Sequence, residues 1–489
     1  MNLIRKLAGQ TAIYGIPSIL GRLLNYLLVP LYTRIFIPEE FGVVTELYAY
    51  VSFLIIILTY GMETALFRFT QTENNKESVY STILISILSS STVFILLFLA
   101  LSPFIAQGLG YSQNQEYIIW FVFIIAFDGI TAIPFAKLRE QNKPLKFALV
   151  KFTSILSNIL FILFFLVFCP LVYEKGEGIL FEIISLVYSP QISIGYIFIS
   201  NLLASIITVL LLIPYLIPRF YSFDLNLWKR MMKYSLPLLL AGLAGMTNET
   251  ADRIMIKYLL PSDVSLYQLG IYGACYKIAI LMTLFIQSFR FAAEPFFFAQ
   301  YKEKNRTEIY AQVMNYFILA GSLIFLCVVL YIDYVQLFVG EKYREGIKIV
   351  PILLLANLFM GIFFNLSIWY KLSGKTMFGA YLTIIGAAIT VFFNFLLIPK
   401  MGYLGAAWTT LICYSVMMVL SYIIGQKHFP VVYKLKNAGV YIFLAVIIYL
   451  VSIQFAPDEQ FARTFFNTIL LIAFLITAFL IEKVKKVVI

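Results

Sequence analysis

Apolar stretches of about twenty residues or more recur from one end of this chain to the other, and they constrain its fold more than any other feature. A helix of that length crosses the roughly 30 Å hydrocarbon core of a membrane. Because 61% of the residues are hydrophobic and only 12% are charged, a water-soluble fold could not bury the apolar surface. We therefore expect an all-α, multi-pass integral membrane protein.

Hydropathy predicts fourteen transmembrane helices along the chain. They cover about residues 10–36, 42–69, 79–107, 117–136, 147–170, 194–217, 233–259, 265–297, 309–332, 347–370, 377–398, 403–425, 438–455 and 464–481. Lys and Arg concentrate in the connections on the side of the N-terminus, whereas the opposite connections hold Lys175, Lys342, Arg344, Lys400 and Arg463. The positive-inside rule then predicts that both termini are cytoplasmic.

The net charge of +11 has the same topological origin, so we expect no nucleic-acid partner. The four cysteines are scattered through apolar spans without a paired spacing, and the single histidine, His428, has no other ligand residue beside it. These patterns predict no disulfide framework, no metal site and no cofactor.

A weak internal repeat indicates how the spans are organised. An offset of 223 residues aligns similar residues of the two halves, namely Asn25 with Asn248, Arg34 with Lys257, Pro38 with Pro261 and Glu40 with Asp263. Six spans return the chain to its starting side, so two six-helix lobes would be parallel and pseudo-symmetric, with a cavity between them. We predict an N-lobe at 1–218, a C-lobe at 219–430 and two additional helices at 431–489.

Arg22 lies in the middle of the first span, where an uncompensated charge costs several kcal/mol. Asn25 lies near its helical face, so this face is polar. We predict that Arg22 and Asn25 line a water-filled cavity. An ion pair of Arg22 with Glu46, Glu63 or Asp128 is the alternative.

The seventh and eighth spans carry further charges. Glu249 and Asp252 share one face of the seventh span, and Glu249 also lies four residues before Arg253, the favourable order for a helical ion pair. These residues are candidates for the cavity, although mutual neutralisation explains the spacing equally well. Lys277, deep in the eighth span, has no acid nearby in the sequence and is the strongest candidate for a cavity cation.

Two other features of the spans leave alternatives open. Asp128 and Glu63 are acids within the fourth and second spans, and we expect them to serve as counter-ions or as a site for a coupling ion. Arg290 and Glu294 are another pair of opposite charges at helical spacing. They either form a structural ion pair or line the cavity.

One element resembles a known superfamily. "FFNFLLIPKMGYLGAAWTTLICY" (392–414) is similar to the N…P…G..GAA element that joins spans 11 and 12 in the multidrug/oligosaccharidyl-lipid/polysaccharide (MOP) exporters. The residues that carry the match are Asn394, Pro399, Gly402, Gly405, Ala406 and Ala407. The R.F.P.E.FG turn within residues 11–50 and the stretch at 132–152 resemble the polysaccharide branch, the Wzx-type oligosaccharide flippases. The resemblance implies the fold of the multidrug and toxin exporters (MATE).

The resemblance also implies a function. The chain would be a bacterial inner-membrane flippase, not an enzyme, that moves polyprenyl-diphosphate-linked oligosaccharides outward for surface polysaccharide such as lipopolysaccharide. Its partners would be this substrate, membrane lipid and other membrane proteins of polysaccharide assembly. Cations in a site of low dielectric suit the diphosphate, because charge attraction strengthens there.

Three alternatives remain beside this function. Four intramembrane acids keep a cation-coupled multidrug exporter open, namely Glu63, Asp128, Glu249 and Asp252. A lipid II flippase would share the fold. A membrane-embedded polysaccharide polymerase is disfavoured, because the loops carry no acidic metal pair and no catalytic histidine.

Overall fold

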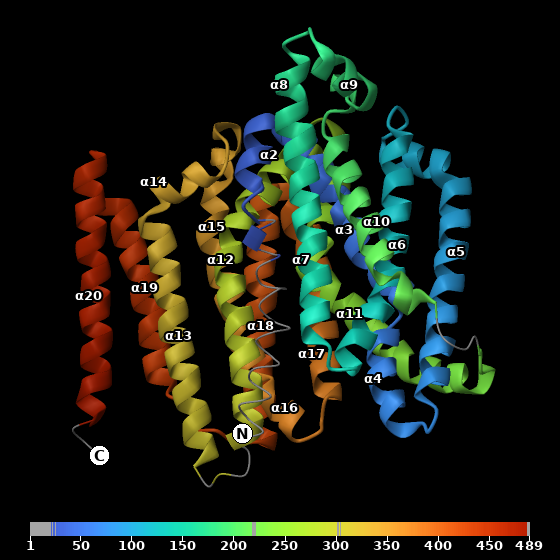
Figure 1. Cartoon of the computed structure of the whole chain (residues 1–489). Helices are drawn as coiled ribbons and strands as arrows, with labels where there is room; N and C mark the ends of the chain where they lie inside the picture. The colour runs from blue at the N-terminus through green and yellow to red at the C-terminus, as the bar shows by residue number, and fades with distance from the viewer. Residues whose placement is uncertain are drawn as a thin grey trace. The chain divides into compact units, whose positions relative to one another are not determined.

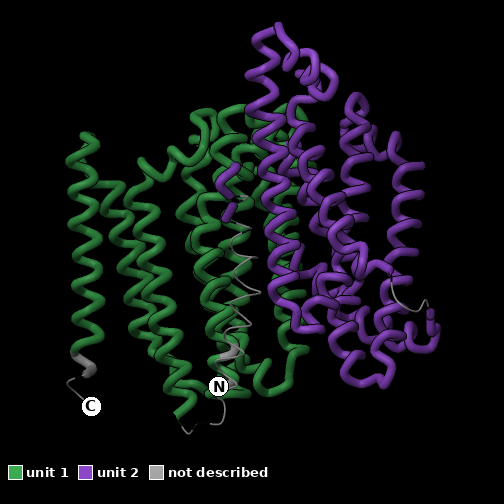
Figure 2. The backbone as a smooth tube through the Cα atoms, viewed as in Figure 1, with its two compact units in different colours: residues 1–12, 29–42, 247–489 green, residues 13–28, 43–246 purple. Residues whose placement is uncertain are grey.

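The computed structural model describes residues 21, 23, 24, 26–217, 222–300, 303 and 305–486. Helices make up nearly all of this part of the chain, and it contains no β-strand (Figure 1). The chain divides into two compact units, coloured separately in Figure 2. Unit 1 comprises residues 1–12, 29–42 and 247–489, and unit 2 comprises residues 13–28 and 43–246.

The helices are long and are joined by short connections. Those of residues 29–216 are α2 (Val29–Ile35), α3 (Pro38–Thr59), α4 (Met62–Thr72), α5 (Lys76–Leu109), α6 (Gln115–Glu140), α7 (Pro144–Leu163), the π-helical η1 (Phe164–Phe168), α8 (Cys169–Tyr173), α9 (Ile179–Val187), the 3-10 helix η2 (Pro190–Ile192) and α10 (Gly195–Leu216). Those of the remaining residues are α11 (Leu225–Leu259), α12 (Ser262–Gln300), α13 (Arg306–Leu330), α14 (Ile332–Val335), the 3-10 helices η3 (Gln336–Phe338) and η4 (Glu341–Ile349), α15 (Val350–Leu366), α16 (Ile368–Leu372), α17 (Met377–Met401), α18 (Tyr403–His428), α19 (Leu435–Phe455) and α20 (Gln460–Lys486).

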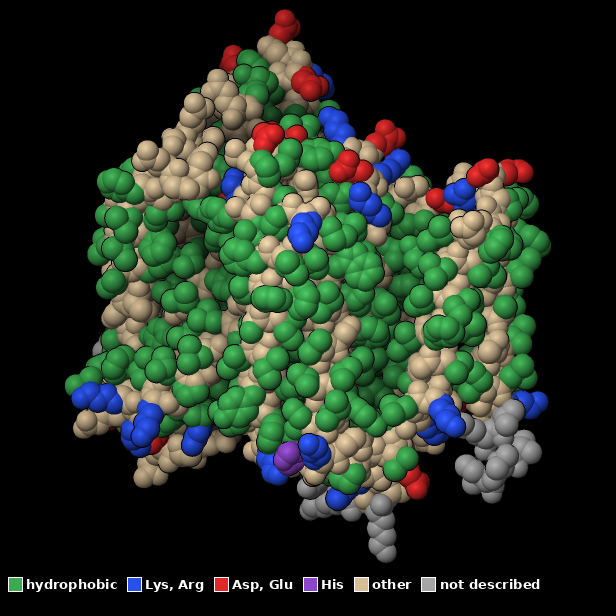
Figure 3. Space-filling view, turned by 180° about the vertical axis from the view of Figure 1, so that it is seen from behind, with side chains coloured by type: hydrophobic (Ala, Val, Ile, Leu, Met, Phe, Trp, Pro, Cys, Tyr) green, Lys and Arg blue, Asp and Glu red, His purple; other side chains and the backbone are tan. Residues whose placement is uncertain are grey.

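Twelve helical segments in the described part are long and apolar enough to cross a membrane. Hydrophobic side chains cover the lengths of the helices on the face seen in Figure 3, and charged side chains gather near helix ends. These features confirm the predicted multi-pass, all-α membrane protein.

The predicted number of fourteen spans is not confirmed. The span at 10–36 is described only in part, and the span at 233–259 lies on α11. This helix is not among the twelve apolar segments, because its second half carries several charged residues. The lobe boundaries at 218/219 and 430/431 remain predictions.

The turn at 29–42 is held by distant parts of unit 1. The Arg34 guanidinium donates to the Leu337 carbonyl at 2.8 Å, and the Tyr343 hydroxyl donates to the Phe36 carbonyl at 2.9 Å. The Gly340 amide donates to the Thr33 hydroxyl, also at 2.9 Å. These bonds explain why the turn is grouped with residues 247–489, more than two hundred positions further along the chain.

Two glycines let α3 and α12 approach backbone to backbone. A Cβ atom at Gly42 would collide with the Leu266 carbonyl, and one at Gly270 would collide with the Pro38 carbonyl. Small residues at a helix crossing allow the two backbones to approach this closely, which is a common way to pack helices in membranes. The Gly of the R.F.P.E.FG turn is therefore a packing residue.

The GAA element forms the tight hairpin between α17 and α18. Gly402 has φ +58°, which a residue with a side chain adopts only with strain, and a Cβ at Gly405 would lie 2.5 Å from the Leu397 carbonyl oxygen. Ala406 and Ala407 are fully buried. These four small residues therefore pack the hairpin closely.

We predict that Gly270→Ala lowers the stability of the purified protein in detergent by about 1–3 kcal/mol, because α3 and α12 must separate. The measurement is thermal unfolding followed by tryptophan fluorescence. Gly108→Ala is the matched control, since nothing lies within 4 Å of its Cβ position on α5. The control should be neutral or stabilising by up to about 1 kcal/mol. An unchanged unfolding temperature for Gly270→Ala would contradict the close approach.

Candidate functional site

A cluster of charged residues lies where α11 faces α12 in unit 1. Asp252 is only 4% exposed, and its carboxylate accepts a hydrogen bond from the Tyr272 hydroxyl of α12. Its other oxygen lies 3.4 Å from the Arg253 guanidinium. Arg253 also donates to the Glu249 carbonyl at 2.6 Å and lies over the Tyr276 ring, 4.6 Å from its centroid. The charges of Asp252 and Arg253 therefore neutralise each other.

The ion pair between the Glu249 and Arg253 side chains, one of the two alternatives from the sequence, is not formed. The Glu249 side chain makes no hydrogen bond or salt bridge with any described residue. Lys277, half-buried on α12, likewise has no hydrogen-bond or salt-bridge partner in the described part of the chain. Lys277 is close enough to interact electrostatically with Glu249, which attracts it, and with Arg253, which repels it.

Asn248 fixes α11 against α17 and α18. Its side-chain amide donates to the Thr383 carbonyl at 3.0 Å, and its oxygen accepts from the Thr390 hydroxyl at 3.3 Å. The Tyr414 hydroxyl of α18 donates to the Asn248 carbonyl at 3.3 Å. Since Asn248 is buried, these bonds fix the turn of α11 that carries Glu249.

A second polar group lies inside unit 2. The Asp128 carboxylate of α6 accepts from the Ser205 hydroxyl of α10 at 3.0 Å and interacts electrostatically with Lys151 of α7. Nearby on α10, the Asn201 amide donates to the Tyr48 hydroxyl at 2.7 Å. Sequence spacing alone did not connect Asp128 with Lys151, although both are ions of opposite sign within apolar spans.

Two other candidate pairs are occupied. Glu63 lies 2.6 Å from the Arg139 guanidinium, so its charge is neutralised on the surface of unit 2. Glu294 binds Lys371 and lies 3.8 Å from Arg290, which supports the interpretation of Arg290 and Glu294 as a structural pair.

Arg22 and Asn25 lie outside the described residues, so their cavity-lining function stays a prediction. Sequence reasoning missed Tyr276 and Tyr414, which come from other helices and reach α11 only in the folded chain. No group of three or more His, Cys, Asp or Glu side chains that could hold a metal is found among the described residues.

Comparison with known proteins decides the family. The family described as "Polysaccharide biosynthesis protein" matches residues 7–299. The chain belongs to this family. It is also 24% identical over 421 residues to the capsular polysaccharide biosynthesis protein CapF of Staphylococcus aureus, covering 85% of this chain and 98% of CapF.

The solved structures that resemble this family member are transporters. The lipid II flippase MurJ, in an inward closed conformation, has a TM-score of 0.71 at 15% identity and covers 94% of this chain and 97% of MurJ. An inward-facing MATE transporter of the MOP superfamily has a TM-score of 0.58 at 15% identity. The match covers 87% of this chain and 94% of the transporter's chain. The MATE-like fold predicted from the sequence is thereby confirmed.

We predict that Asp252→Ala destabilises the protein by about 3–5 kcal/mol, because the half-buried Arg253 guanidinium loses its carboxylate and Tyr272 loses its acceptor. Thermal unfolding in detergent measures the change. Glu249→Ala, three residues earlier on the same helix, should change stability by no more than about 0.5 kcal/mol, since its carboxylate has no described partner. Equal losses for both variants would show that the Asp252 contacts do not stabilise α11.

Proposed function

We propose that this family member is a flippase that translocates polyprenyl-diphosphate-linked oligosaccharides from the cytoplasmic to the outer leaflet. In this proposal, the substrate headgroup passes a cationic central cavity by alternating access, and the polyprenyl tail stays in the lipid. The protein resides in the bacterial cytoplasmic membrane with both termini inside and has no catalytic function. Membership of a polysaccharide biosynthesis family and the transporter fold support this proposal.

The observation that carries the proposal is Lys277, which has no ion-pair partner in the described part of the chain. It lies fifteen residues after the start of α12, about 22 Å along the helix axis at 1.5 Å per residue, within an apolar span. An ammonium group at such a depth is unfavourable unless water or an anion reaches it. A diphosphate carried through the membrane is an anion that would bind such a group.

Glu249 supplies a reason why the site can release its substrate. In this proposal, Lys277 interacts with Glu249 in the empty state and with the diphosphate in the loaded state. The nearby carboxylate competes with the substrate for the same cation, so binding is reversible. Arg253 remains neutralised by Asp252 and holds the geometry.

In the same proposal, the turn at 29–42 holds the transporter in one of its alternating conformations. Its hydrogen bonds to η4 and to the Leu337 carbonyl hold one conformation. Alternating access would require these bonds to break and form again in each cycle.

We predict that Lys277→Gln fails to restore surface polysaccharide in cells that lack their own flippase for the cognate repeat unit, whereas the wild-type protein restores it. Lys277→Arg should restore part of it, because the charge is kept. Surface polysaccharide is quantified by immunoblot, and protein levels are measured in the membrane fraction.

Lys400→Gln is the matched control, since Lys400 is an exposed lysine at the end of α17 with no described partner. It should complement fully. Wild-type levels of polysaccharide with Lys277→Gln, at equal expression, would contradict the function assigned to Lys277.

A cation-coupled exporter of cationic drugs is the second candidate. The exposed carboxylate of Glu249, which has no partner among the described residues, favours it, with Asp128 as a further acid. Overexpression in a drug-sensitive strain separates the two functions, because a flippase would not raise resistance. Complementation of a strain depleted of its lipid II flippase tests the third possibility, which rests on likeness of fold alone.

A further inference from the structure

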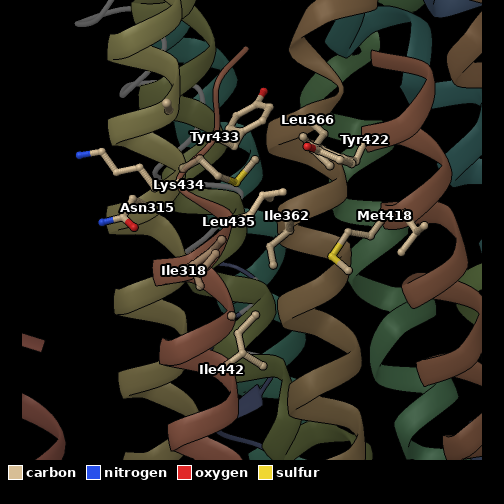
Figure 4. A pocket seen from close by; sticks show the side chains of 15 residues that line it. Asn315, Ile318, Ile362, Leu366, Met418, Tyr422, Tyr433, Lys434, Leu435 and Ile442 are labelled. Atoms are coloured by element: carbon tan, nitrogen blue, oxygen red, sulfur yellow. The ribbon is translucent and has the colours of Figure 1, made fainter. Parts of the chain in front are cut away.

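An apolar crevice of about 280 Å³ opens in unit 1, away from the charged cluster of α11 and α12. Figure 4 shows its walls, with Ile318 of α13 and Ile442 of α19 on one side and Ile362 of α15 and Met418 of α18 on the other. For comparison, a cavity of roughly 150 Å³ is large enough to bind benzene. The crevice therefore has room for a segment of a hydrocarbon chain.

The crevice is open to the surroundings of the protein. Val419 of α18 and Leu435 of α19 belong to its lining, yet they are 47% and 54% exposed. An empty apolar crevice would lose dispersion contacts along its walls. In a membrane, an aliphatic chain from the adjacent leaflet supplies those contacts.

Basic groups lie at one end of the crevice. Lys434 belongs to the lining and Lys436 follows in the first turn of α19, and neither has an acidic partner among the described residues. Together with the N-terminal amides of α19, these ammonium groups match a phosphate group.

We infer that this crevice binds one anionic phospholipid of the leaflet on the side of Lys434. One acyl chain fills the space between α13, α15, α18 and α19. The phosphate binds Lys434 and Lys436. The lipid thereby fastens α19, which is otherwise poorly buried, to the preceding helices. This inference is independent of the proposed function.

The test is native mass spectrometry of the full-length protein in detergent, titrated with phosphatidylglycerol or with phosphatidylcholine. The wild-type protein should retain one phosphatidylglycerol in preference to phosphatidylcholine. The double variant Lys434→Glu/Lys436→Glu should bind phosphatidylglycerol at least about tenfold more weakly. Gly439→Phe should also lose the lipid, because nothing lies within 4 Å of its Cβ position and the ring can occupy the crevice.

Two controls match these variants. Lys229→Glu reverses an exposed, unpaired lysine of α11, and Gly108→Phe fills open space beside α5. Both should retain phosphatidylglycerol. If Gly439→Phe does not fold, the lysine variant decides the outcome.

Three results would overturn the inference. They are equal retention of the two lipids by the wild-type protein, wild-type binding by the site variants, and displacement of phosphatidylglycerol by equimolar undecaprenyl phosphate. The last result would assign the crevice to a polyprenyl chain instead.

Discussion

The contact between Asp252 and its two partners makes the charged half of α11 compatible with a membrane protein. The carboxylate is almost fully buried, and Arg253 and Tyr272 together satisfy its oxygens. Without these contacts, the Asp252 carboxylate and the Arg253 guanidinium would each be removed from water with no compensation, which is strongly unfavourable. With them, α11 keeps its position against α12, and Glu249 and Lys277 have no ion-pair partner among the residues that the structure describes. The proposed chemistry of the site depends on that difference between paired and unpaired ions.

A second constraint is the close backbone contact of the turn at 29–42 with α12. It gives four positions of this turn (RIFIPEEFG, 34–42) a physical task. Arg34 binds the Leu337 carbonyl, the carbonyl of Phe36 accepts from Tyr343, and Pro38 begins α3. Gly42 and Gly270 remove the side chains that would keep the two helices apart. A short sequence motif thus encodes a contact between segments that are far apart in the chain.

Much of the fold could be predicted from the sequence, because membrane spans are local features of length and hydropathy. Lys277 was also recognisable, since no acid lies near it in the sequence and none pairs with it among the described residues. The partner of Arg253 could not be recognised from the sequence. Helical spacing favours Glu249, but Tyr272 and Tyr276 from α12 orient Asp252 and Arg253 towards each other. The Asp128 contacts with Ser205 and Lys151 were also invisible, because they join three helices.

The most direct test of the account is translocation by the purified protein in proteoliposomes. A polyprenyl-diphosphate oligosaccharide with a fluorescent sugar is placed in both leaflets, and a membrane-impermeant reductant that irreversibly destroys the fluorophore is added outside. Without transport, about half of the fluorescence stays protected. The account predicts that active protein makes nearly all of the label accessible, and that Lys277→Gln leaves the protected half unchanged. Equal accessibility with the wild-type protein and with protein-free vesicles would contradict it.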